Sequence, residues 1–410
     1  MTAAPVDTAT DTTARPDSPG SIDVSPPEEG EAVPSSVPVP LSGRAGLHHW
    51  YLLWPALVYL AARGLTLLGL TVAKVFIHHD SLWSQLYRWD GKWFVHVVTR
   101  GYPSSLPLSH GHVAGSTIAF FPVFPLLIRG LSDLTTLEPV VAAEIISAVT
   151  GLMATLAVGM LTCQFAGEQK ATRAALLFAV FPGTFAFSLM YSEGIAITCI
   201  ALGLVALLRH RWWLAGLLGL VATATTPIAL AFVVSCAWSA ERAIRRDRTW
   251  PSLAAPVLAP LGFIAYMVYL WVHTGQLNAW RLAEQGGWKS YPSLAYPVHI
   301  VTTFLADPLR PTLTGQLLFA GTAITVVAAV VAIRQHQPGP VLIYGLLAAV
   351  IAAASAAVGL RPRFIMLAFP LIIAVATRLR GRAYDGVFAL SLAGLGAMTY
   401  LELFSGAVFP

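Results

Sequence analysis

The chain has 410 residues, of which 56% are hydrophobic and only 11% are charged, and its formal net charge is +5. Because soluble domains usually carry about a quarter charged residues, this composition excludes a soluble globular protein and indicates a chain that crosses the membrane many times. The basic residues are scattered between apolar stretches rather than gathered on one face, so nucleic acid is not expected as a partner.

Residues 1–43 contain seven acidic residues and one arginine, and they have almost no large apolar residue. Such a segment buries too little surface to offset the entropy of ordering, so we expect a disordered cytoplasmic tail. The segment also lacks the basic start and apolar core of a signal peptide. Residues 44–410 are expected to form one transmembrane domain.

Residues 50–77 form the first expected span, which is long enough to cross roughly 30 Å of hydrocarbon. Arg44, His48 and His49 precede it, and basic flanking residues favour a cytoplasmic N-terminus. Arg63 falls inside the span and is therefore expected to face the bundle interior. A structural ion pair and a functional role explain this arginine equally well.

The next stretch, residues 78–116, is expected to be an outside loop, and it begins with a dense group of acidic, basic and aromatic side chains. That group consists of Arg88, Trp89, Asp90, Lys92 and Trp93. Residues 91–99 can form a short helix, which we expect to lie in the membrane interface with tryptophan at headgroup depth. Asp90 would then lie at the boundary between water and lipid.

Further apolar segments bring the expected total to about eleven transmembrane helices. They cover residues 117–134, 140–165, 171–208, 212–240, 253–273, 313–333, 341–358, 364–377 and 385–404. Glu193 lies within one of them and cannot face lipid, so it should line the active cavity or pair with a basic residue. Orientation signals conflict over residues 171–240: either Arg209 and Arg211 lie outside, or the chain turns back at Pro227.

Two later features also belong to the expected outside face. Residues 274–312 form a second long loop rich in aromatic side chains, and Arg361 and Arg363 lie at the outer end of a span. The basic run within residues 242–248 is the strongest cytoplasmic marker.

An interfacial carboxylate with cations and aromatic rings nearby suits the displacement of a lipid phosphate from a sugar. Asp90 would accept the proton of the attacking hydroxyl, and the cations would stabilise the departing phosphate. The phosphate-binding candidates are Arg88, Lys92, Arg361 and Arg363, and the candidates for contact with sugar or lipid are Trp89, Trp93, Tyr102 and Glu193. A donor with a single phosphate calls for no metal or other cofactor. The three cysteines lie in apolar segments without a C-x-x-C pair, so they indicate no zinc site.

Several short motifs resemble those of the PIG-V-type mannosyltransferase family of actinobacteria. They are RWDGKWF at 88–94, GYP at 101–103, FFPVFPLL at 120–127, FP at 181–182, YSE at 191–193 and RPRF at 361–364. The resemblance covers roughly residues 50–380. The chain departs from it at Thr225-Thr226-Pro227, where similar proteins often carry an arginine before the proline.

The resemblance implies a GT-C membrane fold and an inverting glycosyltransferase at the extracytoplasmic face. The implied donor is a polyprenyl-phosphate sugar, usually mannose, and the implied base is the acid of the first loop, which is Asp90 here. The acceptor could be a glycan, a glycolipid or a protein.

Other interpretations of the same residues stay open at this point. Asp90 could cap the interfacial helix, and the tryptophans and cations around it could be membrane anchors. Arg361 and Arg363 could serve only as topology determinants. The whole chain could instead be a lipid or solute transporter or flippase, or a non-catalytic envelope scaffold that keeps the same fold.

Overall fold

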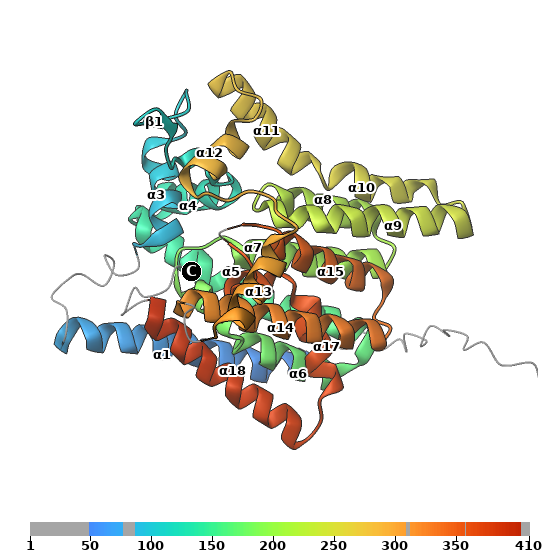
Figure 1. Cartoon of the computed structure of the whole chain (residues 1–410). Helices are drawn as coiled ribbons and strands as arrows, with labels where there is room; N and C mark the ends of the chain where they lie inside the picture. Colours follow the sequence, from blue (N-terminus) through green and yellow to red (C-terminus); the bar gives the residue numbers. More distant parts are fainter. Residues whose placement is uncertain (1–48, 77–86, 309–311, 357, 403–410) are drawn as a thin grey trace, which may run out of the picture. The chain divides into compact units, whose positions relative to one another are not determined.

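The computed structural model describes residues 49–76, 87–308, 312–356 and 358–402. The expected tail, residues 1–43, lies outside the described residues. Within the described part the chain is helical apart from one hairpin, in which β1 (Leu108–Ser109) pairs antiparallel with β2 (His112–Val113). The expected all-helical membrane class is confirmed (Figure 1).

The helices follow one another with short connections. In chain order they are η1 (His49–Leu52), α1 (Leu53–Phe76), α3 (Trp89–Arg100), η2 (Thr117–Ala119), α4 (Val123–Thr135), α5 (Pro139–Ala166), α6 (Glu168–Ala179), η3 (Pro182–Ser188), α7 (Glu193–Leu208), α8 (Trp212–Thr223), η4 (Pro227–Ala229), α9 (Leu230–Asp247), η5 (Trp250–Leu253), α10 (Ala254–Leu258), α11 (Leu261–Thr274), α12 (Ala279–Gly287), α13 (Tyr296–Ala306), α14 (Leu313–Arg334), α15 (Gly339–Ala353), α16 (Pro362–Leu367), α17 (Phe369–Arg378) and α18 (Arg382–Tyr400).

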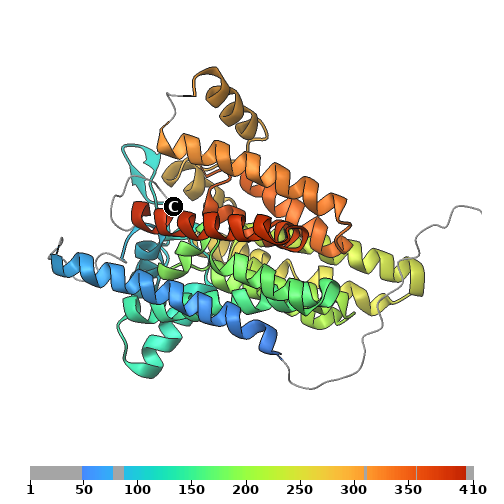
Figure 2. The same cartoon turned by 90° about the horizontal axis from the view of Figure 1, so that it is seen from below.

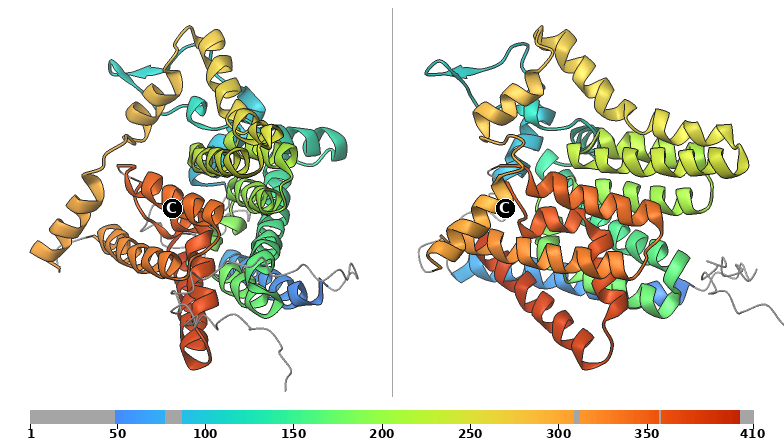
Figure 3. Two further views of the ribbon diagram at one scale, coloured as in Figure 1. Left: turned by 90° about the vertical axis from the view of Figure 1, so that its right-hand side faces the viewer. Right: turned by 45° about the vertical axis from the view of Figure 1, so that its right-hand side comes forward.

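Five helical segments of the described chain are long and apolar enough to cross a membrane. They are Trp50–Gly69, Pro139–Ala166, Pro227–Asp247, Trp250–Thr274 and Leu313–Arg334. Shorter apolar helices such as α7, α8 and α15 pack between them, and Figure 2 shows many helices running side by side. Viewed from the right-hand side of Figure 1, most helices are seen nearly end-on (Figure 3, left). The total of about eleven spans stays a prediction.

The expected second span, residues 117–134, is wrong. This segment forms the short helix η2 and then the 13-residue helix α4, and α4 is not among the segments able to span. A span needs about 20 residues. Pro122 and Pro125 lack a backbone N–H, so the helix begins only at this proline pair. The first loop therefore runs on to the start of α5.

The chain reverses at Pro227, which decides between the two alternatives for residues 171–240. Two glycines of α8 lie against α10 and show the direction of α8. A Cβ at Gly216 would meet Ala254, and a Cβ at Gly219 would meet Ala259. Contact positions advance along both helices together, so α8 runs parallel to α10. In the chain α9 follows α8 and precedes α10, so it runs antiparallel to both. Arg209 and Arg211, just before α8, therefore lie at the same end of the bundle as the C-terminal turn of α9. We call this the basic end, and the opposite end, where α7 begins at Glu193, the site end.

The buried arginine of the first span faces the bundle interior, as expected. Arg63 is 6% exposed, and its Nη1 donates to Ser188 Oγ at 2.9 Å and to the Thr184 carbonyl. These bonds tie α1 to η3. Arg63 therefore has structural contacts, but these are hydrogen bonds to a hydroxyl and a carbonyl rather than the expected ion pair.

Candidate active site

The first-loop helix α3 carries Asp90 on its first turn. The helix begins at Trp89, and the residue at its N-cap position is Arg88 rather than Asp90. The interpretation of Asp90 as the helix cap is therefore wrong. Trp89 has φ +50°, a left-handed conformation that is strained for an aromatic residue, and strain of this kind gathers at functional sites.

The predicted interfacial helix is confirmed as a helix, and its buried face anchors it to the bundle. Phe94, Val95 and Val97 are buried, and Phe94 meets Phe124 of α4 edge-on at 4.9 Å between ring centroids. Asp90 thus stands on a well-packed element rather than on a free loop.

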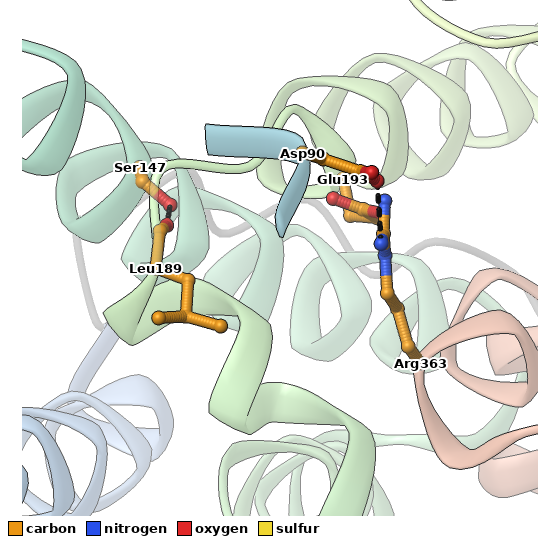
Figure 4. Close-up of polar contacts among 5 residues, drawn as sticks. All are labelled: Asp90, Ser147, Leu189, Glu193 and Arg363. Carbon is orange, nitrogen blue, oxygen red and sulfur yellow. Dashed lines mark hydrogen bonds and ion pairs between the residues drawn. The ribbon is translucent and has the colours of Figure 1, made fainter. Parts of the chain in front are cut away.

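A tight turn before α7 positions Glu193. Ser147 of α5 donates its hydroxyl hydrogen bond to the Leu189 carbonyl at 2.5 Å (Figure 4). The Tyr191 N–H donates to the same carbonyl at 2.8 Å. Glu193 is the first residue of α7 and is 5% exposed. A carboxylate is favoured there by the positive end of the helix dipole.

Arg363, on the first turn of α16, joins the two carboxylates (Figure 4). Its Nη1 lies 2.7 Å from Asp90 Oδ2, and its Nε donates to Glu193 Oε1. The guanidinium also lies over the Tyr191 ring, 4.0 Å from the ring centroid. Burial disfavours the charged guanidinium, but Glu193 and Asp90 outweigh this effect and raise the pKa of Arg363.

The exposure of these side chains differs in a way that matters for chemistry. The Arg363 and Glu193 side chains are 9% and 6% exposed, whereas that of Asp90 is 25% exposed. Asp90 is therefore the open edge of a largely buried ion cluster. We call the residues Asp90, Glu193 and Arg363 the ion cluster.

Sequence reasoning did not single out Glu284 on α12 of the second long loop. Trp288, four residues later, meets Trp93 at 5.4 Å between ring centroids, and Asp90 lies one turn before Trp93. This ring contact packs the end of α12 against α3, the helix that carries Asp90. Burial, and then the nearby Asp90, raise the pKa of Glu284 to about 8. The sequence feature that could have identified Glu284 is its spacing: Trp280, Glu284 and Trp288 follow one another at intervals of four residues, which places them on one side of a helix.

Glu402, just beyond α18, is a second acid that sequence reasoning missed. It is 1% exposed, and its carboxylate has no hydrogen-bond partner within the described residues. It lies within electrostatic range of Arg363 and Arg361. Arg361 occupies the N-cap position of α16, so both predicted arginines lie at the site end.

Other predicted site residues have contacts of their own. Trp93 stacks on Phe120 with centroids 6.0 Å apart, and the Tyr102 hydroxyl donates to the Phe120 carbonyl at 2.8 Å. Lys92 is exposed, and Arg88 is half-buried. The structure thus brings Asp90, Glu193 and Arg363 together, while it uses Tyr102 and Trp93 to hold the first loop.

No three His, Cys, Asp or Glu side chains of the described chain are grouped so that they could hold a metal ion.

Comparisons with known proteins give structural neighbours but no sequence family. No family model and no curated protein match the chain. ArnT from Cupriavidus metallidurans bound to undecaprenyl phosphate has a similar structure, with a TM-score of 0.51 and 15% identity, over 82% of this chain and 62% of that one. The archaeal oligosaccharyltransferase AglB from Archaeoglobus fulgidus, in complex with an inhibitory peptide and a dolichol-phosphate, has a TM-score of 0.43 and 13% identity, over 88% of this chain and 56% of that one.

The second likeness is too distant to support an argument, and at 15% identity the first concerns the fold alone. The match spans less than two thirds of the ArnT chain. The chain is a helical, multi-pass membrane protein with a GT-C-like fold.

Proposed function

We propose that the chain is an inverting glycosyltransferase that moves mannose from a polyprenyl-phosphate donor to an acceptor hydroxyl at the extracytoplasmic face. The observation that carries this proposal is the position of Asp90, which lies at the open edge of the ion cluster, 2.7 Å from Arg363. The similarly folded ArnT was solved with undecaprenyl phosphate bound, which supports a lipid-phosphate donor. The resemblance to PIG-V-type enzymes supports mannose.

In the proposed reaction the acceptor oxygen attacks C1 of the sugar from the face opposite the phosphate. The bond between C1 and the phosphate oxygen breaks, and its electron pair leaves with the lipid phosphate. The proton of the acceptor hydroxyl passes to Asp90. General-base catalysis of this kind contributes about 10²–10⁴-fold to the rate.

The remaining residues have supporting roles in this proposal. Arg363 orients Asp90 through the ion pair at 2.7 Å, and Glu193 holds Arg363 in turn. Arg361 and Arg363 at the start of α16, with Arg88 and Lys92 on the first loop, are the candidates to stabilise the departing phosphate. Trp89, Trp93 and the ring of Tyr102 are candidates to contact the sugar or the lipid chain.

The partners follow from the same chemistry. The donor is a membrane lipid, and the acceptor is a glycan, glycolipid or protein hydroxyl outside the cell. On this proposal no metal or other cofactor is called for, because the donor carries a single phosphate that arginine and lysine side chains can stabilise.

A transporter or flippase is the main rival. Such proteins place polar side chains and broken helices near the middle of the bilayer. The bent pair α6 and η3, at 68°, agrees with that pattern. The ion cluster favours the transferase instead, because its Asp90 belongs to α3 of the first loop, and α3 is not among the segments of the described chain that could span a membrane.

The direct test uses the purified chain in liposomes with radiolabelled polyprenyl-phosphate mannose and, in parallel, polyprenyl-phosphate glucose. We expect transfer from the mannose donor, with inversion at C1 measured by NMR of the product. Retention at C1, or equal transfer from both donors, would contradict the proposal. Movement of the lipid between leaflets without transfer would favour the rival.

A further inference from the structure

A second site lies at the basic end, far from the ion cluster. A cavity of about 720 Å³ opens there beside Leu207 and Leu208, the last residues of α7. Because α7 begins at Glu193 and rises 1.5 Å per residue, the cavity lies roughly 20 Å from the ion cluster. Its polar and aromatic lining consists of His210, Trp212, Trp238, Ser239, Glu241, Arg242, Arg245, Arg246 and Asp247.

The arginines of the cavity differ in how their charge is balanced. Arg245 pairs with Glu241 on the same helix, and Arg246 lies 4.0 Å from Asp247. Arg242 has no carboxylate within ion-pair distance among the described residues, and its guanidinium lies over the Trp238 ring at 4.9 Å from the centroid. Arg242 is therefore the cation available to an anionic ligand.

The Trp238 ring beneath the Arg242 guanidinium is held in place by close packing. A Cβ at Gly339, the first residue of α15, would collide with the Trp238 ring, so that ring lies directly on the α15 backbone. Trp212, the first residue of α8, is buried at 7% exposure. Because the Arg242 guanidinium stacks on a fixed Trp238 ring, its positive charge is held in place before a ligand binds.

Exposed tryptophans indicate the depth of this cavity in the membrane. Trp213 and Trp250 are 64% and 65% exposed, and both belong to helix starts at the basic end. Tryptophan in such positions marks the headgroup layer. A preference of arginine for the cytoplasmic side would explain the charges, but it requires neither a cavity nor a tryptophan fixed beneath Arg242.

We propose that this cavity binds the phosphate headgroup of an anionic phospholipid. The phosphodiester contacts Arg242, and the glycerol and the first part of the acyl chains lie along Trp212 and Leu208. The site is separate from the ion cluster, so this proposal does not depend on the proposed transferase activity.

The test measures lipid binding by the full chain in detergent, using native mass spectrometry with short-chain phosphatidylglycerol. Short-chain phosphatidylcholine and inorganic phosphate form the comparison arms. We expect one tightly held phosphatidylglycerol per chain and weaker retention of phosphatidylcholine. We also expect Arg242→Gln to weaken phosphatidylglycerol binding about tenfold, because a charge-assisted bond to phosphate is lost.

Arg380→Gln is the matched control, since Arg380 is an exposed arginine just beyond α17 at the same end and does not line the cavity. It should leave binding unchanged. Trp238→Leu is a second variant and should weaken binding in the same direction as Arg242→Gln. Equal binding by the wild type and both cavity variants would overturn the proposal. Equal binding of the two lipids, or displacement of phosphatidylglycerol by an equal concentration of inorganic phosphate, would also overturn it.

Discussion

Arginines are present at both ends of the bundle, but the two ends hold them differently. At the site end Arg363 is buried between Asp90 and Glu193 and lies over Tyr191. At the basic end the Arg245 and Arg246 side chains are 80% and 87% exposed, and each has a carboxylate of the same helix as its ion-pair partner. The comparison teaches that an arginine in a membrane protein is informative when it is buried and joins distant helices.

This difference predicts unequal energetic effects. Removing one partner of a buried ion pair typically costs about 3–5 kcal/mol, because the remaining charge is left unpaired. An exposed pair contributes about 0–1 kcal/mol. Mutations at the two ends therefore test the comparison directly.

The largest effect on stability is expected from Arg363→Met, which leaves two carboxylates without their cation. We expect it to lower the free energy of unfolding by about 3–5 kcal/mol. Arg245→Met, its counterpart at the basic end, should change stability by less than about 1 kcal/mol. Thermal unfolding of both variants in the same detergent measures the difference, and similar losses would show that the ion cluster contributes no more than a surface pair.

A smaller effect is expected from Gly183→Ala, which tests how η3 supports Arg363. A Cβ at Gly183 would collide with the Pro362 carbonyl oxygen, next to Arg363 in the chain. We expect this overpacking to cost about 1–3 kcal/mol and to lower activity as well. Gly396→Ala on α18, where a Cβ meets nothing within 4 Å, is the control and should be close to neutral. If Gly183→Ala behaves like the control, the close contact of η3 with α16 does not position the site.

The smallest effect at neutral pH is expected from Glu284→Gln. The pKa of Glu284 is raised to about 8, so this carboxyl is mostly protonated at pH 7 and ionises as the pH rises through about 8. Ionisation adds a negative charge beside Asp90 and the incoming lipid phosphate, so transfer should fall above about pH 8. The Glu284→Gln variant should be nearly as active at pH 7 and should lose this alkaline decline.

A rate profile from pH 6 to 10 measures both properties of Glu284. Glu241→Gln, which changes a carboxyl at the basic end, provides the control and should keep the wild-type profile. An unchanged alkaline decline in Glu284→Gln would remove Glu284 from the site.

Much of the fold could be predicted from the sequence because long apolar segments are a local signal. The spans at residues 50–77, 140–165 and 313–333 correspond to α1, α5 and α14. The expected span at 117–134 is wrong because the helix begins only at Pro122 and Pro125, which leaves 13 residues, too few to cross a membrane. The direction of α8 depends on which helices pack together, and composition does not record that.

The residues of the site could be predicted from the sequence, but the contacts between them could not. Asp90, Glu193 and Arg363 were each identified by being charged in or beside apolar segments. The Arg363–Glu193 pair joins residues 170 positions apart, and only the packing of α16 against η3 brings them together. Glu284 looked like an ordinary polar loop residue, because its neighbour Asp90 lies almost 200 residues earlier in the chain.

The central claim, that Asp90 takes the proton of the acceptor, is tested most directly by single-turnover transfer from prebound polyprenyl-phosphate mannose. Asp90→Asn should keep donor binding and fold, and it should lower the rate of transfer about 10²–10⁴-fold. Asp133→Asn, which changes an exposed carboxylate on α4, is the control and should transfer at the wild-type rate. Transfer by Asp90→Asn at the wild-type rate would contradict the account.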